Sequence, residues 1–243
     1  MSKSLTGRRR LYLMRHGHVD YFAPGLTDFT QVSLTEEGQE QAKAAGEALR
    51  NIAFDHIFTS GLPRTQQTAA AVMAANSKDY NAPVTIPSFE ELKGGKVVVE
   101  TREELAARLA FSFDAATEPG ATFLPDGEAF ETAYERITKG LLEIVEDFAW
   151  KQALLVAHDG VNRILLGAAC GAGLGGIAHF EQDLACINVL DLDVVRNEEN
   201  ELSFARIIIK AVNLTAYDPV KHSLSKTSLE HLFDIDFGGG RPL

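Results

Sequence analysis

Runs of apolar residues alternate, over most of the chain, with segments that repeat their apolar positions every three or four residues. The runs are typical of buried strands, and the repeating segments are typical of amphipathic helices. Strands are expected at residues 11–14, 55–60, 153–157, 185–195 and 203–214, and helices at 33–51, 62–76, 128–150 and 160–169. This alternation predicts a three-layer α/β/α sandwich around a largely parallel central sheet.

Turn and capping residues mark the boundaries of several of these elements. Ser33 stands three residues before Glu36, which predicts a capping box at the start of the first helix. The polar stretch 196–200 predicts a hairpin between the last two strands. Residues 94–130 lose a clear period and carry Pro and Gly, so we expect a cap over one face of the sheet, and we expect 218–243 to form a polar tail. The whole chain is expected to form a single domain.

Composition narrows the possible partners. The formal net charge of −11 disfavours nucleic acid and anionic membranes, because those surfaces are bound through basic patches. No apolar run approaches the roughly 18 residues of a membrane span. The basic residues at 8–10 precede only four apolar residues, which is too short for an export signal, so a cytoplasmic protein is expected. Cys170 and Cys186 lie in apolar surroundings without C-x-x-C spacing, and we expect both to be buried and unpaired.

Charged and imidazole side chains follow three of the predicted strands. The first strand is followed by Arg15, His16 and Gly17, the second by Arg64 and the third by His158. Ligands of open α/β sheets bind outside the carboxyl ends of the strands, so we expect these side chains to meet at one edge. Glycine after each histidine lets the backbone approach a ligand, and helices that begin nearby direct N–H groups at an anion. The sequence therefore predicts a phosphate site.

Four segments of the chain match the motifs of one known family, in the same order and with similar spacing. "LYLMRHG" resembles an R-H-G signature, "SLTEEGQEQA" an L-T-x-x-G-x-x-Q-A helix, "TSGLPRTQQTA" an S-x-x-x-R-x-x-Q-T-A segment and "LLVAHDGVNRILL" a V-x-H-x-G-x-x-R segment. R-H-G alone is a weak signal, but four ordered motifs are specific. The chain thus resembles the histidine phosphatase, or phosphoglycerate mutase-like, superfamily over about residues 10 to 190.

The resemblance implies a fold, a reaction and a set of site residues. It implies the phosphoglycerate mutase-like fold and a metal-independent hydrolysis of a small phosphomonoester, with no cofactor, through a phosphohistidine. His16 corresponds to the nucleophile. Arg15, Arg64 and His158 correspond to the donors that grip the phosphoryl oxygens, which guanidinium groups do bidentately.

The acid and the pocket entrance follow from the same resemblance. The family's acid lies in an apolar-x-Glu-apolar segment with a Gly four residues later, and in "PSFEELKGG" this register selects Glu91, with the adjacent Glu90 as the fallback. Because the acid must protonate the leaving oxygen, the pKa of its carboxyl is expected above that of a free side chain. Gly17 and His18 are expected to contact the substrate, with His18 at the pocket mouth.

Within this family the residues favour a phosphatase over a phosphoglycerate mutase. A mutase cap usually carries E-R-H-Y-G and paired arginines, whereas residues 94–130 offer few cations. Val19 and Phe22 stand where polar residues are usual, which predicts a less polar entrance and a substrate with an apolar portion. Glu128, in "LPDGEAFE", resembles the Glu of a P-x-G-E-S segment and either borders the site or starts the following helix.

Three other functions stay open at this stage. Mutase-type phosphoryl transfer is the first, and a regulatory module that binds phosphate but turns over poorly is the second. The third is a zinc-dependent hydrolase, because "HGHVD" places His16, His18 and Asp20 at alternate positions where they could ligate one ion. The remaining histidines have no supporting context and are expected to be structural or solvated: His56, His179, His222 and His231. The oligomeric state is left open.

Overall fold

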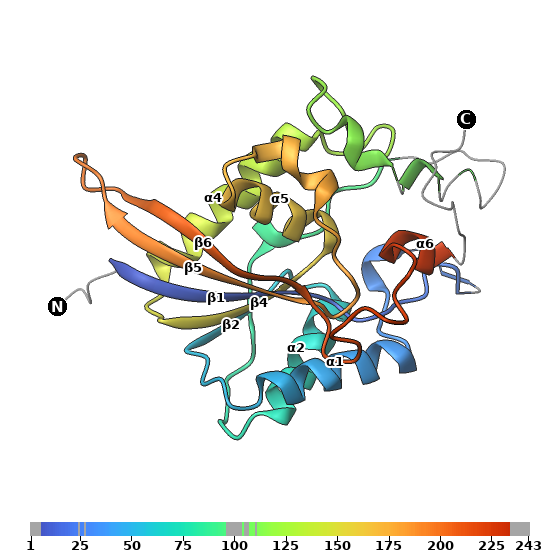
Figure 1. Ribbon diagram of the computed structural model, residues 1–243, viewed down its shortest axis with the longest axis horizontal. Helices are drawn as coiled ribbons and strands as arrows, with labels where there is room; N and C mark the ends of the chain where they lie inside the picture. Colours follow the sequence, from blue (N-terminus) through green and yellow to red (C-terminus); the bar gives the residue numbers. More distant parts are fainter. Residues whose placement is uncertain are drawn as a thin grey trace.

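A six-stranded sheet lies between two layers of helices in a computed structural model that describes residues 6–23, 25–26, 28–95, 104, 107–109 and 111–233 (Figure 1). The strands are β1 (Gly7–Arg15), β2 (His56–Thr59), β3 (Val84–Thr85), β4 (Gln152–Ala157), β5 (Ile187–Arg196) and β6 (Leu202–Leu214). The helices are α1 (Glu36–Leu49), α2 (Pro63–Ala75), α4 (Phe130–Asp147), α5 (Asp159–Ala169) and α6 (Ser228–Phe233). Short 3-10 helices are formed by Phe29–Gln31, Pro87–Phe89, Ser112–Ala115 and Gly173–His179.

The strand order is β3-β2-β4-β1-β5-β6. β4 pairs in parallel with both β2 and β1, and β3 pairs in parallel with β2. β5 is antiparallel to β1, and β6 returns antiparallel to β5. The predicted three-layer sandwich with a largely parallel sheet is therefore confirmed, and so is the hairpin at 196–200. Asn200 has a φ of 66° in that hairpin, a left-handed conformation that Asn adopts more readily than most residues.

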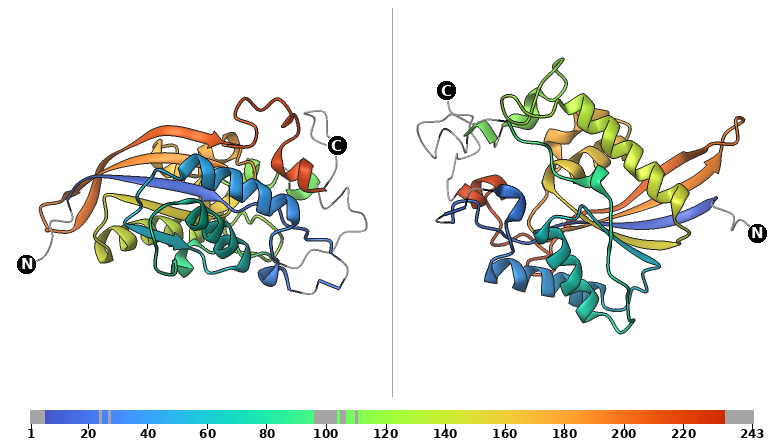
Figure 2. Two further views of the ribbon diagram at one scale, coloured as in Figure 1. Left: turned by 90° about the horizontal axis from the view of Figure 1, so that it is seen from below. Right: turned by 180° about the vertical axis from the view of Figure 1, so that it is seen from behind.

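The apolar runs are buried because both faces of the sheet are covered. Successive side chains of a strand point to opposite faces. In β1, Leu11 and Leu13 join the core that packs under α4 and α5, whereas Tyr12 and Met14 join the core against α1 and α2. Figure 2 shows the two pairs of helices on opposite sides of the sheet. Two covered faces explain why these strands have continuous apolar sequences.

The start of α1 differs from the predicted capping box. Thr35, rather than Ser33, is the N-cap residue, and its hydroxyl accepts a hydrogen bond from the N–H of Gly38 at 3.1 Å. Leu34 forms a β-bridge with Val19, which keeps the chain extended up to this point and delays the helix. Ser33 therefore stays outside the first turn, and the capping-box prediction is wrong.

The two cysteines differ in exposure. Cys186 is buried, as expected, and burial raises the pKa of its thiol to about 12. Cys170 is exposed at the C-terminal end of α5, because the helix ends there at the surface of the molecule. The prediction of burial is therefore wrong for Cys170. Both cysteines are free, as the spacing indicated.

The predicted cap and tail fall only partly within the described residues. Of the cap at 94–130, residues 96–103, 105–106 and 110 lie outside them, as do residues 234–243 of the tail. In the described part of the tail, the chain returns from β6 toward the start of α1 and ends in α6 (Figure 1). Across the described ranges, the structure contains no helix of the length and apolar character that a membrane crossing requires.

A close contact between two glycines joins the end of β1 to the start of α1. A Cβ placed on Gly17 would overlap the carbonyl oxygen of Gly38, and a Cβ placed on Gly38 would overlap the carbonyl oxygen of His18. Only glycine lets two backbone segments approach this closely. The glycine of the L-T-x-x-G motif thus positions the segment that carries His16.

We predict that Gly38→Ala destabilises the protein by about 1–3 kcal/mol, the usual cost of overpacking, and also lowers activity because it displaces the segment that carries His16. Urea unfolding and kcat would measure the two effects. Gly175→Ala is the matched control, because its Cβ would meet nothing closer than 3.8 Å. Equal free energies of unfolding for the two variants would contradict the packing argument.

Candidate active site

The parallel pairing of β1 with β4 brings two imidazoles together. Arg15 lies opposite Ala157 in this pairing, so the residues that follow them, His16 and His158, leave the sheet side by side. The N–H of His16 donates to the carbonyl of Ala157 at 3.2 Å. The two rings meet edge to face, with their centroids 5.3 Å apart. The convergence expected from the strand ends is therefore present for these histidines.

His16 is held in one tautomer. Its Nδ1 lies 2.7 Å from the carbonyl oxygen of Gly17. Because a carbonyl oxygen only accepts, Nδ1 carries the proton and Nε2 keeps its lone pair. Burial, followed by the charges of Arg64 and Arg15, lowers the pKa of His16 well below its usual value. The ring is therefore neutral near pH 7, with a free nucleophilic nitrogen.

His158 is oriented by a chain of hydroxyl groups. Thr65 donates its hydroxyl proton to the carbonyl of Leu62, so it accepts a hydrogen bond from Ser60. Ser60 in turn accepts from Nε2 of His158 at 2.9 Å. Burial and the charge of Arg64 lower the pKa of His158 well below its usual value. Its Nδ1 is buried without a hydrogen-bond partner in the described structure.

Two arginines lie beside the imidazoles. Arg15 donates to the carbonyl of Gln182, and Arg64 donates to the carbonyl of Phe29 at 3.2 Å. Arg64 also lies over the ring of Tyr21, with 5.9 Å between its guanidinium carbon and the ring centroid. Each arginine is only 4% exposed, and in each the Nε is buried without a partner among the described residues.

These unpartnered nitrogens indicate an anion site. Arg15 Nε, Arg64 Nε and His158 Nδ1 come from three different strand ends, and all three are buried. An unsatisfied buried polar group costs about 1–3 kcal/mol, and more when it is charged. An anion with several acceptor oxygens would satisfy both guanidinium nitrogens, and Nδ1 of neutral His158, which carries no proton, would accept from a protonated oxygen of the same anion. Phosphate offers both kinds of oxygen and matches the geometry of guanidinium groups.

Glu91 reaches this site from a different element. It follows the 3-10 helix Pro87–Phe89, and its carboxylate accepts a hydrogen bond from the N–H of Leu92 at 2.9 Å. It packs against the start of α5, since a Cβ on Gly160 would lie 2.9 Å from Glu91 Oε1. Burial raises the pKa of Glu91 to about 7; Asp159 adds to this, and the two arginines oppose it.

A salt bridge that sequence reasoning missed fixes the segment around Glu91. Arg136, on α4, donates to the carbonyls of Ser88 and Glu90 at 2.9 and 3.0 Å. It also pairs with Glu128 at 2.6 Å, and Glu128 accepts from the N–H of Lys93 at 3.3 Å. The pair thus holds the chain on both sides of residue 91. The P-x-G-E resemblance marked Glu128, but no motif marked Arg136.

Gly17 and His18 make contacts within the protein that the sequence did not predict. The N–H of Gly17 donates to the hydroxyl of Thr68 at 3.1 Å, so this group is already bonded within the protein. Nδ1 of His18 lies 2.8 Å from the hydroxyl of Thr35, and its ring lies near His231. Contacts of either residue with substrate remain predictions.

One expectation about the segment after His16 is wrong, and one alternative loses its support. Val19 is fully buried against Leu34, because the bridge between them turns its side chain into a small apolar cluster, so it cannot line the entrance. Within the described chain, the ligand atoms of His16, His18 and Asp20 do not converge. The carboxylate of Asp20 instead accepts the N–H of Phe22, which removes the support for a zinc site at the H-x-H-x-D string.

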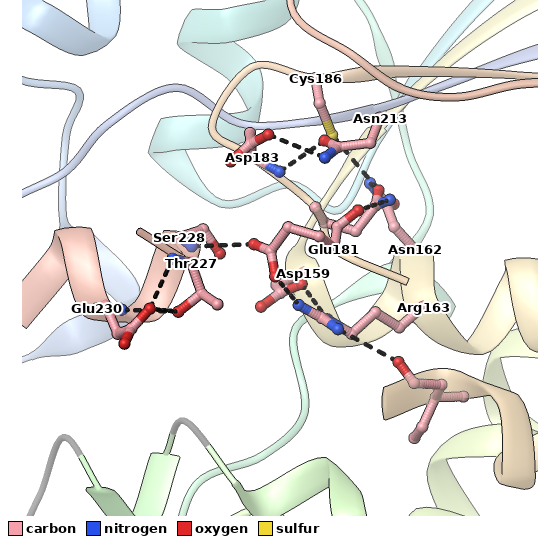
Figure 3. Close-up of polar contacts among 12 residues, drawn as sticks. Asp159, Asn162, Arg163, Glu181, Asp183, Cys186, Asn213, Thr227, Ser228 and Glu230 are labelled. Carbon is pink, nitrogen blue, oxygen red and sulfur yellow. Dashed lines mark hydrogen bonds and ion pairs between the residues drawn. The ribbon is translucent and has the colours of Figure 1, made fainter. Parts of the chain in front are cut away.

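An ion-pair network connects the site to the tail. Asp159, which follows His158, pairs with Arg163 at 2.6 Å, and Arg163 pairs with Glu181 at 3.1 Å. Glu181 accepts from the N–H of Ser228 at 2.9 Å, at the start of α6 (Figure 3). One oxygen of Asp159 is buried without a partner in the described structure.

Comparisons with known proteins match most of the chain to one family. Residues 11–203 match the family described as "Histidine phosphatase superfamily (branch 1)". The adenosylcobalamin/alpha-ribazole phosphatase of Escherichia coli (strain K12) is 28% identical over 187 residues, covering 76% of this chain and 90% of the relative. The relative named "Probable phosphoglycerate mutase GpmB", from Enterobacter sp. (strain 638), is 30% identical over 188 residues, covering 74% and 81%.

Solved structures give the same fold. The crystal structure of the alpha-ribazole phosphatase from Shigella flexneri has a TM-score of 0.62 and 25% identity, and the match covers 84% of this chain and 96% of that one. The native structure of mycobacterial glucosyl-3-phosphoglycerate phosphatase has a TM-score of 0.67, 22% identity and coverages of 85% and 99%. The latter supports the fold alone.

Proposed function

This chain belongs to the histidine phosphatase superfamily (branch 1), whose phosphatases work through a phosphohistidine, and we propose that it hydrolyses small phosphomonoesters with His16 as the nucleophile. The observation that carries the assignment of His16 is its tautomer. Nδ1 is engaged by the carbonyl of Gly17, so a neutral Nε2 is available beside two buried guanidinium groups. No cofactor is part of the proposal, because the arginines supply the positive charge that phosphoryl transfer requires.

In the first half of the reaction, Nε2 of His16 attacks phosphorus and the bond to the leaving oxygen breaks. Glu91 gives its proton to that oxygen, and its raised pKa supports this role. Arg15 and Arg64 donate to the equatorial oxygens, where the negative charge spreads, and His158 contacts a protonated oxygen through Nδ1. The carbonyl of Gly17 stabilises the positive charge that the phosphorylated ring acquires.

In the second half, water attacks the phosphohistidine and the bond between nitrogen and phosphorus breaks. Glu91, now a carboxylate, accepts the proton of the water, so the same group serves as acid and then as base. His16 returns to the neutral tautomer with its proton on Nδ1, and inorganic phosphate leaves.

The substrate is proposed only as a class. The phosphatases among the relatives act on different small phosphate esters according to their names, so the substrate of this chain does not follow from them. Phosphoglycerate mutase activity is the second candidate, because one relative at 30% identity carries that name. The single-domain organisation and the cytoplasmic location stay predictions.

We expect aryl phosphate hydrolysis to continue in excess EDTA and to be lost in His16→Ala, because the nucleophile is absent and the arginines alone cannot form the intermediate. Rapid acid-free quenching with labelled substrate should trap an acid-labile phosphoryl group on the wild-type chain. Circular dichroism would verify that His16→Ala is folded. Activity that requires an added metal would argue against the proposal.

We predict that kcat/KM for phosphorylation of the enzyme by an alkyl phosphate falls as the pH rises through about 7, because Glu91 of the free enzyme then loses the proton that the leaving oxygen needs. Glu91→Gln should lower this rate by about 10²- to 10⁴-fold and remove the pH dependence near 7. The rate reduction in Glu91→Gln should be smaller with a phosphate ester of an acidic phenol, because the phenolate leaves without being protonated.

Glu90→Gln is the matched control for Glu91→Gln. The carbonyl of Glu90 is held by Arg136, and its side chain has no part in the proposed chemistry. Single-turnover kinetics across pH should therefore give a wild-type profile for Glu90→Gln. If the rate fell in Glu90→Gln but not in Glu91→Gln, Glu90 would be the acid instead of Glu91.

We expect little 2-phosphoglycerate to form when the enzyme is incubated with 3-phosphoglycerate and a bisphosphoglycerate primer. A mutase must bind a carboxylate and a second phosphate position, which requires further cations, whereas the described site has two arginines beside the imidazoles. Phosphorus NMR would distinguish released inorganic phosphate from the isomer. Faster isomer formation than phosphate release would reverse the assignment.

A further inference from the structure

We propose that His18, Glu37 and His231 form a binding site for Zn²⁺ that ties α6 to the start of α1. His18 lies two residues beyond the proposed nucleophile, Glu37 is in the first turn of α1, and His231 is on α6. Each offers one ligand atom, and the three atoms lie within 4.8 Å of one another. The ion would take no part in the proposed phosphoryl chemistry, and only His18 is shared with the predicted substrate contacts.

The donor set favours a zinc-type ion. Two imidazole nitrogens and one carboxylate oxygen are ligands that zinc prefers, whereas Mg²⁺ and Ca²⁺ prefer oxygen ligands throughout. Ligand atoms of a tetrahedral zinc site lie roughly 3.3 Å apart, so side-chain rotations are enough to close the observed spacing. Three protein ligands leave a fourth position for water. Glu37 and His231 line a cavity of about 710 Å³ between α1 and the tail, which gives such a water room.

Outer contacts already orient two of the three ligands. Buried Gln41 accepts the backbone N–H of His18 at 2.9 Å through its carbonyl oxygen and donates through its amide to Glu37 Oε1 at 2.9 Å. Nδ1 of His18 lies 4.0 Å from Glu37 Oε2 and 2.8 Å from the hydroxyl of Thr35, and an ion bound to Nδ1 would replace the contact with Thr35. Hydrogen bonds such as those of Gln41 fix ligand orientation in metal sites, and their loss typically weakens metal binding about 10- to 100-fold.

The third ligand is presented by an anchored helix. The N–H of Ser228 donates to Glu181, and Thr227 donates to the carboxylate of Glu230, which closes the first turn of α6 (Figure 3). His231 then lies with Nε2 3.5 Å from Glu37 Oε1. Its position therefore follows from contacts made elsewhere on α6. An ion bound here would add a second attachment of this helix, to α1.

The test is equilibrium dialysis of the full-length, untagged chain, stripped with EDTA, against Zn²⁺. The wild type should bind one ion at this site. Glu37→Gln and His231→Ala should each weaken binding at least about 10-fold, since removing a ligand costs more than removing an outer contact. His222→Ala, which removes an exposed imidazole from the same tail, should bind as the wild type does.

His16→Ala separates this site from zinc held by the imidazoles of the proposed active site. Binding that survives His16→Ala and is lost in His231→Ala supports the proposal, and the opposite pattern overturns it. Unchanged binding in both ligand variants, or none in the wild type, overturns it as well. Hydrogen exchange gives an independent readout: Zn²⁺ should slow amide exchange in α6 of the wild type but not of Glu37→Gln. Activity in EDTA tests the phosphatase assignment separately.

Discussion

The arrangement at the edge of the sheet depends on the burial of two guanidinium groups beside two imidazoles. Burial lowers the pKa of both imidazoles, and the charges of Arg15 and Arg64, which persist in any environment a protein offers, lower it further, so the rings are neutral. Nucleophilic attack requires a neutral ring. An anion binds to buried cations whose hydrogen-bond donors are not all satisfied, as in Arg15 and Arg64. One electrostatic constraint therefore produces both the nucleophile and the site that holds its target.

This constraint can be met only if the strand ends deliver their residues in register. The pairing of Arg15 with Ala157 makes His16 and His158 neighbours, and a shift of one residue would turn one ring to the other face of the sheet. The contact between Gly17 and Gly38 then sets how closely α1 approaches the end of β1. Backbone geometry, rather than side-chain flexibility, thus positions the nucleophile.

The sequence predicted what depends on local pattern and on strand ends. Continuous apolar runs marked β1 and β4, and the residues after them marked His16 and His158, because topology brings such ends together. Contacts between segments that are far apart in the chain could not be predicted, because no local sequence pattern marks them. The pairing of Arg136 with Glu128 and the approach of His231 to Glu37 depend on how α4 and α6 pack, and the burial of Val19 depends on a single bridge.

Glu91 illustrates how the site can use one carboxyl in two protonation states. Burial and the nearby Asp159 favour its proton, while Arg64 and Arg15 oppose it, and burial has the larger effect. A bound phosphate dianion offsets the arginine charges, so substrate binding itself should raise this pKa further and supply the acid. When the leaving group departs with this proton, Glu91 becomes a carboxylate and can act as the base. Burial alone would keep the carboxyl protonated, and cationic charge alone would keep it ionised. Because the two effects oppose each other, the same residue can serve as the acid in one half-reaction and as the base in the other.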